Sequence, residues 1–439
     1  MESVPASTHN ILDLLRAYES RNVTFIAADG SWPIVWEQAR GVHVRDADGK
    51  KYLDLTAAFG VAAAGHANPR VVRAGQQQMG RLLHAMGDVH PHALKARLAR
   101  ELSRLTFERW TADAPAWLRH TGKTIFGNSG FEAVEAALKT ALLATGKPGI
   151  IAFRGAYHGL GYGALNATHR QLFRSPFRAQ LRQFGYFVDF PAATAPLNPI
   201  GKAMDRLFKK HRIGAVLVEP VQGRGGIRVP PLEFLPWLRQ QCDRHGALLI
   251  VDEIYTGFGR TGRWFACEHS QTVPDLICLG KALTGGFPLS ACIGRAGLMD
   301  AAWPPSDGEA IHTSTFLGHP VGCAMALAQI CEIEQRQLIG RSERLGRFLL
   351  DQLQSLTSRC PHPGTARGLG LMAGLELRKS NGAPATQLVL RLITQMLHRG
   401  YILLPEGEDS NVIGFTPPLT ITRAQLQECL DCLGTLFAS

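Results

Sequence analysis

The sequence has 439 residues, of which 45% are hydrophobic and 19% charged, and its formal net charge is +11. This composition is typical of a soluble globular protein and excludes a disordered or fibrous chain. The basic residues are spread along the chain, and the densest run, 206–212, stands at an expected helix end, where cations interact favourably with the helix dipole. We therefore expect no nucleic-acid partner.

The nine cysteines are scattered and mostly lie in apolar stretches, which is typical of free thiols in a reducing compartment. Cys429 and Cys432 form a CxxC pair, but it falls in a helical pattern without a second pair, so we expect no metal site. The amino terminus lacks a secretory signal pattern, and no apolar run approaches the length of a membrane span. The expected location is the cytoplasm, with no membrane partner.

The first part of the chain predicts helices around one β-hairpin. Residues 9–20 have the spacing of an amphipathic helix. Two alternating strands within 41–57 surround the turn residues 46–49, which predicts the hairpin. Helical patterns follow at 69–86 and 91–106.

From about residue 124, short apolar strands alternate with helices. Helices are predicted over 130–146, with a terminal glycine as the C-cap, and over 232–246. The strand predictions are 149–153, 214–220, 247–251 and 275–280. Continuous apolar runs of this length are typical of parallel strands buried on both faces. The pattern therefore predicts an α/β fold with a mostly parallel sheet covered by helices.

A second unit is expected from about residue 335. It begins with a helix over 332–356 and continues with strands at 371–377 and 401–405, separated by another helix. The final helix is predicted to start after Thr422, with Gln425 at capping-box spacing.

Gly257, Gly259 and Gly262 match the G-x-G-x-x-G spacing of a dinucleotide-binding loop. That loop requires the glycines at a strand-to-helix turn, so that a pyrophosphate meets a helix N-terminus. Here five residues separate the strand 247–251 from the first glycine, and no convincing helix follows. We interpret the match as a coincidence and retain a nicotinamide-dependent oxidoreductase only as a remote alternative.

Asp252 follows the strand 247–251, and Lys281 follows the strand 275–280. Ligands of open α/β sheets bind at the carboxyl ends of the strands, so both side chains are site candidates. A desolvated lysine becomes a neutral amine that forms a Schiff base with a carbonyl, the chemistry of pyridoxal phosphate. Asp252 suits the pyridine nitrogen of that cofactor, an ion pair of about 4 kcal/mol before desolvation is subtracted. Taken alone, Asp252 is equally well explained as a helix cap or a buried ion pair.

A phosphate site and a ring platform also have candidates. Ser129 and Gly130 stand at a predicted helix start, where free N–H groups favour an anion, although a plain serine N-cap has the same pattern. Tyr157, followed by Gly159, is a candidate to cover a cofactor ring, although a lone tyrosine is more often a core residue.

Together these stretches resemble the class III pyridoxal-phosphate aminotransferases, which share the fold of aspartate aminotransferase (fold type I). The resemblance covers nearly the whole chain, and its motifs occur in the family's order: 41–69, 127–139, 155–159, 216–226, 251–262, 280–286, 313–326 and 367–377. It implies a seven-stranded-type sheet in a large cofactor-binding domain, 69–334. It also implies a small α+β domain built from both termini, 1–68 and 335–439.

The resemblance further implies the roles of individual residues around the cofactor. Lys281 forms the Schiff base and then moves the proton between the substrate carbon and the cofactor. Asp252 pairs with the pyridine nitrogen. Ile254 packs beneath the ring, and Tyr157 with His158 lies over it.

Other roles concern the phosphate and the substrate. Ser129 and the backbone of Gly130 and Phe131 hold the phosphate, with Phe131 in place of a usual small residue. Thr315 resembles the threonine that reaches a phosphate across a subunit interface, which implies a homodimer with active sites at that interface. Glu219 corresponds to the family's acid on the substrate side.

Several positions depart from the family pattern. Tyr255 stands where many members carry a glutamine near the phenolic oxygen of the cofactor. Gly414 stands where members acting on glutamate and ω-amino acids often carry an arginine that binds a carboxylate, so the donor and acceptor pair stays open. Phe59 is a candidate for the substrate pocket and equally for the core. Candidate replacement arginines are Arg174, Arg178, Arg228 and Arg263.

The expected function is transamination in two half-reactions through pyridoxamine phosphate, from an amine or ω-amino acid to an oxo acid. A racemase, decarboxylase or aminomutase with the same cofactor remains an alternative, because one fold hosts all of these reactions. A cofactor-sensing regulator is less favoured, because no DNA-binding segment is attached.

Overall fold

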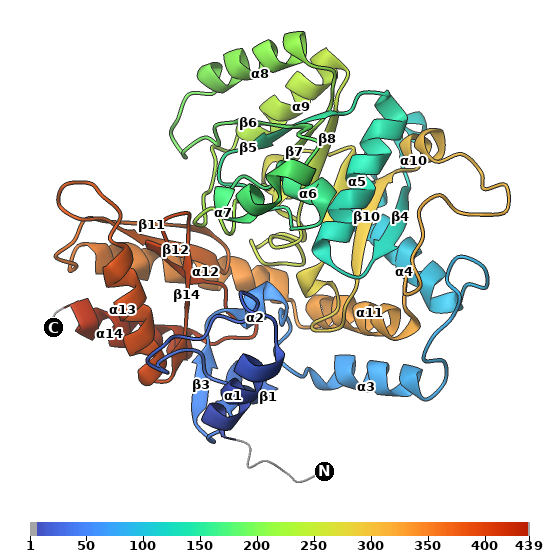
Figure 1. Ribbon diagram of the computed structural model, residues 1–439. Coiled ribbons are helices and arrows are strands. Elements are labelled where there is room, and N and C mark those ends of the chain that lie inside the picture. The colour runs from blue at the N-terminus through green and yellow to red at the C-terminus, as the bar shows by residue number, and fades with distance from the viewer. Residues whose placement is uncertain (1–6, 438–439) are drawn as a thin grey trace.

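The computed structural model describes residues 7–437, and its largest sheet has seven strands (Figure 1). In spatial order these strands are β4 (Gly122–Gly127), β10 (Ser290–Arg295), β9 (Leu276–Leu279), β8 (Leu248–Asp252), β7 (Ile213–Val218), β5 (Gly149–Phe153) and β6 (Gly185–Val188). β10 pairs antiparallel with both of its neighbours, and every other pair is parallel. The predicted α/β class with a mostly parallel sheet is confirmed.

Helices cover both faces of this sheet, which is why its strands are apolar throughout. The covering helices are α4 (Ala93–Ser103), α5 (Gly130–Thr145), α6 (Tyr162–Ala167), α8 (Asn198–Lys210), α9 (Phe234–His245) and α10 (Ala296–Ala302). Leu217 packs into a hydrophobic cluster with side chains of α5 and α6, whereas its neighbour Val216 packs into a second cluster with side chains of α4, α8 and α9. The predicted helices at 130–146 and 232–246 are confirmed.

Two four-stranded sheets lie beside the large one. The first contains the predicted hairpin, β2 (His43–Asp46) and β3 (Lys51–Asp54), with β1 (Trp36–Arg40) on one side and β13 (Tyr401–Ile402) parallel to β3 on the other. The second sheet is antiparallel and has the order β11 (Gly364–Leu369), β12 (Met372–Leu377), β15 (Val412–Phe415) and β14 (Leu404–Glu406). The single strand predicted at 401–405 is therefore divided between two sheets, with Leu403 at the change.

The remaining helices are α1 (Thr8–Tyr18), the short turn α2 (Ala57–Gly60), α3 (Pro69–Met79), α7 (Gln171–Arg174), α11 (Pro320–Gln335), α12 (Leu338–Thr357), α13 (Thr386–His398) and α14 (Arg423–Phe437). α3 stops at Met79, although the sequence predicts a helix to residue 86, because Gly80 caps it and an irregular segment follows. The predicted cap of α14 is present: the Thr422 amide donates to Gln425 Oε1 at 2.9 Å, and the Gln425 amide donates to Thr422 Oγ1 at 3.2 Å.

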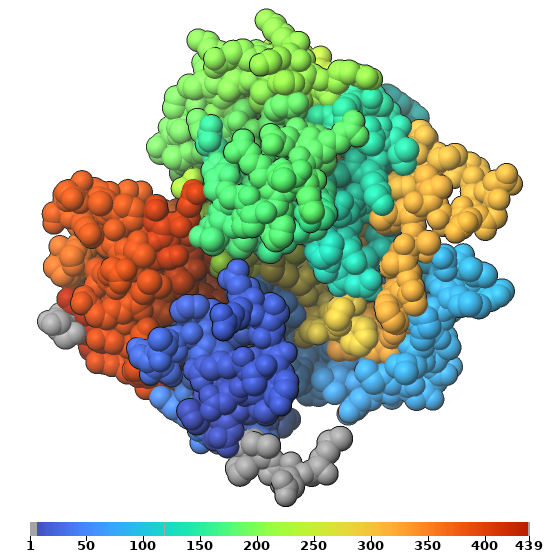
Figure 2. All heavy atoms as spheres, viewed as in Figure 1, coloured from blue at the N-terminus to red at the C-terminus, as the bar shows by residue number. Residues whose placement is uncertain are grey.

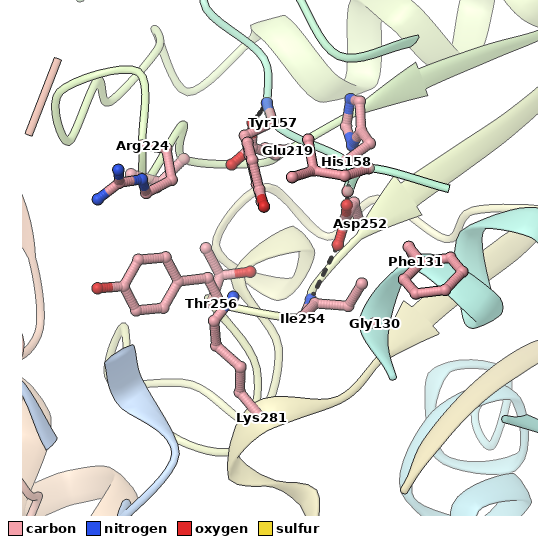
Figure 3. A pocket seen from close by; sticks show the side chains of 14 residues that line it. Gly130, Phe131, Tyr157, His158, Glu219, Arg224, Asp252, Ile254, Thr256 and Lys281 are labelled. Atoms are coloured by element: carbon pink, nitrogen blue, oxygen red, sulfur yellow. Dashed lines mark hydrogen bonds and ion pairs between the residues drawn. The ribbon is translucent and has the colours of Figure 1, made fainter. Parts of the chain in front are cut away.

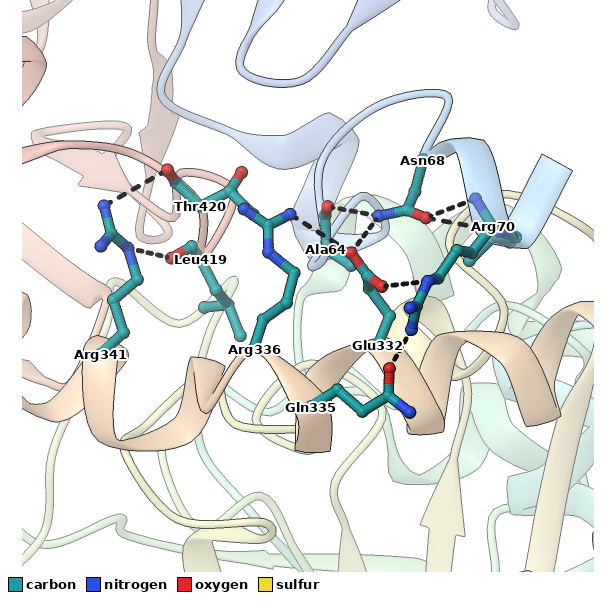
Figure 4. A network of polar contacts seen from close by, with 10 residues as sticks. Ala64, Asn68, Arg70, Glu332, Gln335, Arg336, Arg341, Leu419 and Thr420 are labelled. Atoms are coloured by element: carbon teal, nitrogen blue, oxygen red, sulfur yellow. Dashed lines mark hydrogen bonds and ion pairs between the residues drawn. The ribbon is translucent and has the colours of Figure 1, made fainter.

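The single helix predicted over 332–356 is wrong. α11 ends at Gln335 and α12 begins at Leu338, because Gln337 adopts a left-handed conformation with φ 50° and ψ 41°. Contacts lie on both sides of this break (Figure 4). On the α11 side, the Asn68 amide group donates to Glu332 Oε1 at 3.0 Å. On the α12 side, Arg341 Nε donates to the carbonyl oxygen of Leu419 at 3.1 Å. The break therefore lets one helix bind the N-terminal segment and the next bind the C-terminal segment.

The space-filling view shows the face on which the N-terminal, central and C-terminal parts of the chain meet (Figure 2). Within residues 7–437, no helix combines the length and the apolar character that crossing a membrane requires.

Candidate active site

A cavity of about 370 Å³ opens at the carboxyl ends of β5, β7, β8 and β9 (Figure 3). Most of the residues predicted for the site line this cavity, namely Gly130, Phe131, Tyr157, His158, Glu219, Asp252, Ile254, Tyr255 and Lys281. Because parallel strands place their carboxyl ends at one edge of the sheet, residues far apart in the sequence converge there.

Asp252 is the last residue of β8 and is 4% exposed. Its Oδ2 lies 2.8 Å from His158 Nδ1, and its Oδ1 accepts a hydrogen bond from the Ile254 amide at 3.1 Å. These two contacts fix the orientation of the carboxylate in the cavity wall. The Nε2 atom of His158 is buried and has no hydrogen-bond partner among the described residues.

Lys281 follows β9 in a short 3-10 turn, Lys281–Leu283, and its side chain reaches the cavity floor. Its Nζ lies 4.5 Å from the centre of the Tyr255 ring. Burial lowers the pKa of this amine, whereas the charges of Asp252, Glu219 and Glu406 act in the opposite direction. A lowered pKa favours the neutral, nucleophilic form of the amine.

The start of α5 forms another part of the wall. Ser129 is its N-cap, and Glu132 Oε2 accepts from the Ser129 amide at 3.1 Å. The Ser129 hydroxyl oxygen is buried and has no hydrogen-bond partner among the described residues. Gly130 lies against Ile254, because a Cβ at position 130 would come within 3.1 Å of the Ile254 side chain. This helix start therefore offers an unpartnered hydroxyl and the free amides that bind anions.

Glu219 follows β7 and is 7% exposed. Its two carboxylate oxygens accept from the backbone amides of Tyr157 at 3.0 Å and Gly223 at 3.1 Å. Burial raises the pKa of this carboxyl to about 7, and the nearby Asp252 acts in the same direction. Glu219 thus ties the loop of Tyr157 to the end of β7.

Tyr255 has its ring between two glycines. A Cβ at Gly60 would lie 2.7 Å from this ring, and a Cβ at Gly223 would lie 2.3 Å from it. The Tyr255 hydroxyl contacts Thr416 Oγ1 at 3.2 Å. The tyrosine that stands in place of the family's glutamine therefore joins the cavity to the C-terminal segment.

Three predicted site residues do not line the cavity: Ser129, which directly precedes the lining residue Gly130, Phe59 and Thr315. Phe59 is 51% exposed in a left-handed turn, φ 60°, and Thr315 is also exposed. None of the candidate replacement arginines lines the cavity either; these are Arg174, Arg178, Arg228 and Arg263.

The cavity is also lined by residues that were not predicted from the sequence, namely Arg224, Thr256, Leu160 and Val221. Arg224 had a signal in the sequence. It stands between Gly223 and Gly225 a few residues after a buried strand, where a tight turn returns the chain to the edge of the sheet.

The Gly257–Gly262 loop has no role in this cavity. The Arg260 side chain is 1% exposed and donates through Nη1 to the carbonyl oxygens of Leu371 and Pro417. A Cβ at Gly262 would lie 3.0 Å from Glu343 Cβ, so the glycine allows close packing on α12. The loop connects parts of the fold, as expected if its dinucleotide-like spacing is a coincidence.

The described residues fit pyridoxal phosphate. The unpartnered Ser129 hydroxyl and the start of α5 suit its phosphate, the Asp252 carboxylate suits a protonated ring nitrogen, and the Lys281 amine suits its aldehyde. Within residues 7–437, no group of three or more histidine, cysteine or acidic side chains is arranged to hold a metal ion.

Comparisons with known proteins agree with this geometry. The family model of class III aminotransferases matches residues 25–437. The 5-aminovalerate aminotransferase of Pseudomonas aeruginosa is 36% identical over 416 residues, which cover 92% of this chain and 93% of the relative. The putrescine aminotransferase of Pectobacterium atrosepticum is 36% identical over 415 residues, which cover 92% of this chain and 83% of the relative.

A similar solved structure is that of an amine transaminase from an uncultivated Pseudomonas species, which contains pyridoxal phosphate. Its TM-score is 0.85 at 29% identity, and the match covers 96% of this chain and 98% of the other. The fold, the cavity and these relatives lead to one conclusion. The chain belongs to the class III aminotransferases and is a transaminase that uses pyridoxal phosphate as its cofactor.

Proposed function

We propose that this transaminase takes the terminal amino group of an amine or ω-amino acid and transfers it to an oxo acid. The observation that carries the proposal is the arrangement of Lys281, Asp252 and the start of α5 around one cavity. The named substrates of the relatives, 5-aminovalerate and putrescine, both have an amino group at the end of an unbranched chain and support this donor class.

We propose that Ser129 and the first amides of α5, at Gly130 and Phe131, hold the cofactor phosphate. Asp252, held by His158, binds the ring nitrogen. The side chain of Ile254 covers one face of the ring. Tyr157 and His158 cover the other face.

When bound, pyridoxal phosphate supplies an aldehyde for the amino group and a ring that accepts electrons. The chain itself supplies a base for the proton on the substrate carbon. Lys281 Nζ suits this task, because a lowered pKa favours the neutral amine, which can accept a proton. Asp252 keeps the ring nitrogen protonated, and Glu219 positions the loop that carries Tyr157.

The proposal includes a homodimer in which Thr315 of one protomer reaches the phosphate site of the other. The exposure of Thr315 in the single chain, away from the cavity, supports this arrangement. We also propose a large domain, 69–334, a small domain from 1–68 and 335–439, and a cytoplasmic location. A reducing compartment is supported by the nine free cysteines.

A panel of amino donors and oxo-acid acceptors tests the proposed reaction. Each donor is mixed with the holoenzyme alone, and the cofactor absorbance is recorded, before an acceptor is added and its aminated product is quantified. One equivalent of carbonyl product per site from a terminal amine, followed by an aminated acceptor, is the expected result. Racemisation or decarboxylation of a donor in the absence of any acceptor would overturn it.

A further inference from the structure

An oxo acid carries a carboxylate, and a buried carboxylate needs a cationic or hydrogen-bonding partner. Among the residues that line the cavity, the only permanently charged cation is Arg224 (Figure 3). The other basic side chains there are His158, which contacts Asp252, and Lys281, whose amine the proposed reaction already uses. Before a substrate binds, the guanidinium of Arg224 therefore needs a partner within the protein.

Within residues 7–437, Arg224 has one acidic partner, and the contact between them is long. Its Nη1 lies 3.3 Å from Glu406 Oε2, longer than a close charge-assisted hydrogen bond, and Glu406 Oε2 makes no hydrogen bond to the described residues. The Glu406 side chain is 3% exposed, whereas that of Arg224 is 31% exposed. The guanidinium therefore keeps donors free for a second carboxylate.

Gly414 explains how Glu406 comes to this position. β14 and β15 pair so that Leu404 lies opposite Gly414, and a Cβ at position 414 would lie 3.0 Å from Glu406 Cγ. A long side chain at position 414 would compete with Glu406 for this space. The absence of a side chain at Gly414 therefore leaves the space in which Glu406 reaches Arg224.

We propose that Arg224 binds the carboxylate of the oxo acid, and that this carboxylate replaces Glu406 as the partner of the guanidinium. When a donor without a carboxylate is bound, Arg224 returns to Glu406, so the guanidinium has a carboxylate partner in both steps. The inference rests on the proposed transfer to an oxo acid, and it assigns to Arg224 and Glu406 the discrimination between acceptor and donor.

The test is calorimetric binding of glutarate, a dicarboxylate without an oxo group, to the holoenzyme. Arg224→Gln is expected to raise the Kd for glutarate at least tenfold, because the guanidinium is lost. Glu406→Gln is expected to lower the Kd for glutarate severalfold, because the competing carboxylate is lost. Arg228→Gln is the matched control: its exposed side chain lies on the same segment outside the cavity, so its Kd should equal that of the wild type.

If the glutarate carboxylate replaces Glu406 as the partner of Arg224, the Kd for glutarate should rise in Arg224→Gln and fall in Glu406→Gln. If both variants weaken glutarate binding, or if Arg224→Gln leaves it unchanged, the inference is overturned. Equal melting temperatures and equal cofactor absorbance in both variants and the wild type ensure that the comparison concerns folded holoenzymes. Where Glu406→Gln does not fold, Glu406→Asp replaces it, and its shorter side chain should also tighten glutarate binding.

A second readout separates this inference from the proposed function. The half-reaction with pentylamine, which has no carboxylate, is followed by the cofactor absorbance. Arg224→Gln should lower the rate with the oxo-acid acceptor at least tenfold more than the rate with pentylamine, and an equal loss with amine and acceptor would overturn the exchange. If the wild-type enzyme converts no terminal amine, the proposed donor class fails, whereas the signs of the glutarate shifts still decide the role of Arg224.

Discussion

Two contacts hold the Asp252 carboxylate. One comes from the ring of His158, which lies in a distant loop, and the other comes from the backbone amide of Ile254, two residues after Asp252. The imidazole nitrogen that faces the carboxylate acts as donor only if Nδ1 carries the proton, so this contact also selects the tautomer of His158. The buried Nε2 has no hydrogen-bond partner among the described residues. The Asp252 carboxylate thereby determines which ring nitrogen of His158 carries the donated proton.

Lys281→Ala is expected to lower the transamination rate by about 10²–10⁴-fold, because the chain loses its general base as well as its amine. Borohydride reduction followed by peptide mapping should find the cofactor on the peptide of residue 281 in the wild type only. Lys202→Ala, an exposed lysine of α8, is the control and should match the wild type in both measurements. Full activity of Lys281→Ala would contradict the assignment.

The buried Glu253 makes stability depend on pH. Burial raises the pKa of its carboxyl to about 7, while hydrogen bonds from Thr256 and the Cys267 amide favour the charged form. The folded carboxyl therefore binds its proton more tightly than the unfolded one, so its contribution to stability falls as pH rises from about 4.5 to about 7.

Glu253→Gln removes this titration. The melting temperature of the variant relative to the wild type should increase between pH 5 and pH 8, by an amount equivalent to about 2–3 kcal/mol. The measurement is a series of thermal melts of both proteins at matched ionic strength. A difference that stays constant over this pH range would show that Glu253 ionises normally in the folded protein.

At the scale of elements, the break between α11 and α12 depends on one non-glycine residue in a left-handed conformation. Gln337 has φ 50° and is exposed, so its side chain makes little compensating contact. Gln337→Gly should raise the free energy of unfolding by about 0.5–1 kcal/mol, because glycine adopts this conformation without a Cβ clash. Gln354→Gly, at an exposed position inside α12, should lower it by about 1 kcal/mol. Chemical denaturation of both variants checks the two signs, and the same sign for both would contradict the argument.

Elements with continuous apolar sequence were predictable. The runs at 149–153 and 247–251 became β5 and β8 within one residue of their predicted ends, because burial on both faces demands apolar residues throughout. The break at Gln337 was not predictable, because neither glycine nor proline marks it. The division of 401–405 between two sheets depends on pairing with Lys51–Asp54, which local sequence does not encode.

The active site likewise contains residues that could be predicted from the sequence and residues that could not. Lys281 and Asp252 each follow a recognisable strand, so their meeting at one edge of the sheet could be predicted from periodicity and topology. The pair of Arg224 and Glu406 spans about two fifths of the chain, and the glycine that makes room for it lies on a third segment. Such a pair is visible only after the strands are placed.

At the scale of the whole molecule, the proposed dimer predicts complementation between two inactive variants. Thr315→Glu should abolish binding of pyridoxal phosphate, because a carboxylate would face the phosphate of the partner's site. Lys281→Ala homodimers should be inactive for the reason given above. A hybrid of the two has one site with both defects and one with neither, so it should recover about half of the wild-type activity.

The hybrid is made by co-expression with two affinity tags and tandem purification, and its cofactor content and rate are compared with those of both homodimers. The molar mass of each particle, measured by light scattering, should equal that of two protomers. A Thr315→Glu homodimer with full cofactor content, or an inactive hybrid of correct mass, would contradict a shared site.

The pairing of β3 with β13 also has a consequence for synthesis on the ribosome. The edge of β3 gains its neighbour only when Tyr401–Ile402 have been made, roughly 350 residues later, which takes about 20–70 s at ordinary translation rates. During that interval the hairpin exposes unpaired backbone groups to other nascent chains. The late pairing of β3 with β13 therefore leaves this edge open to pairing with other chains until translation is nearly complete.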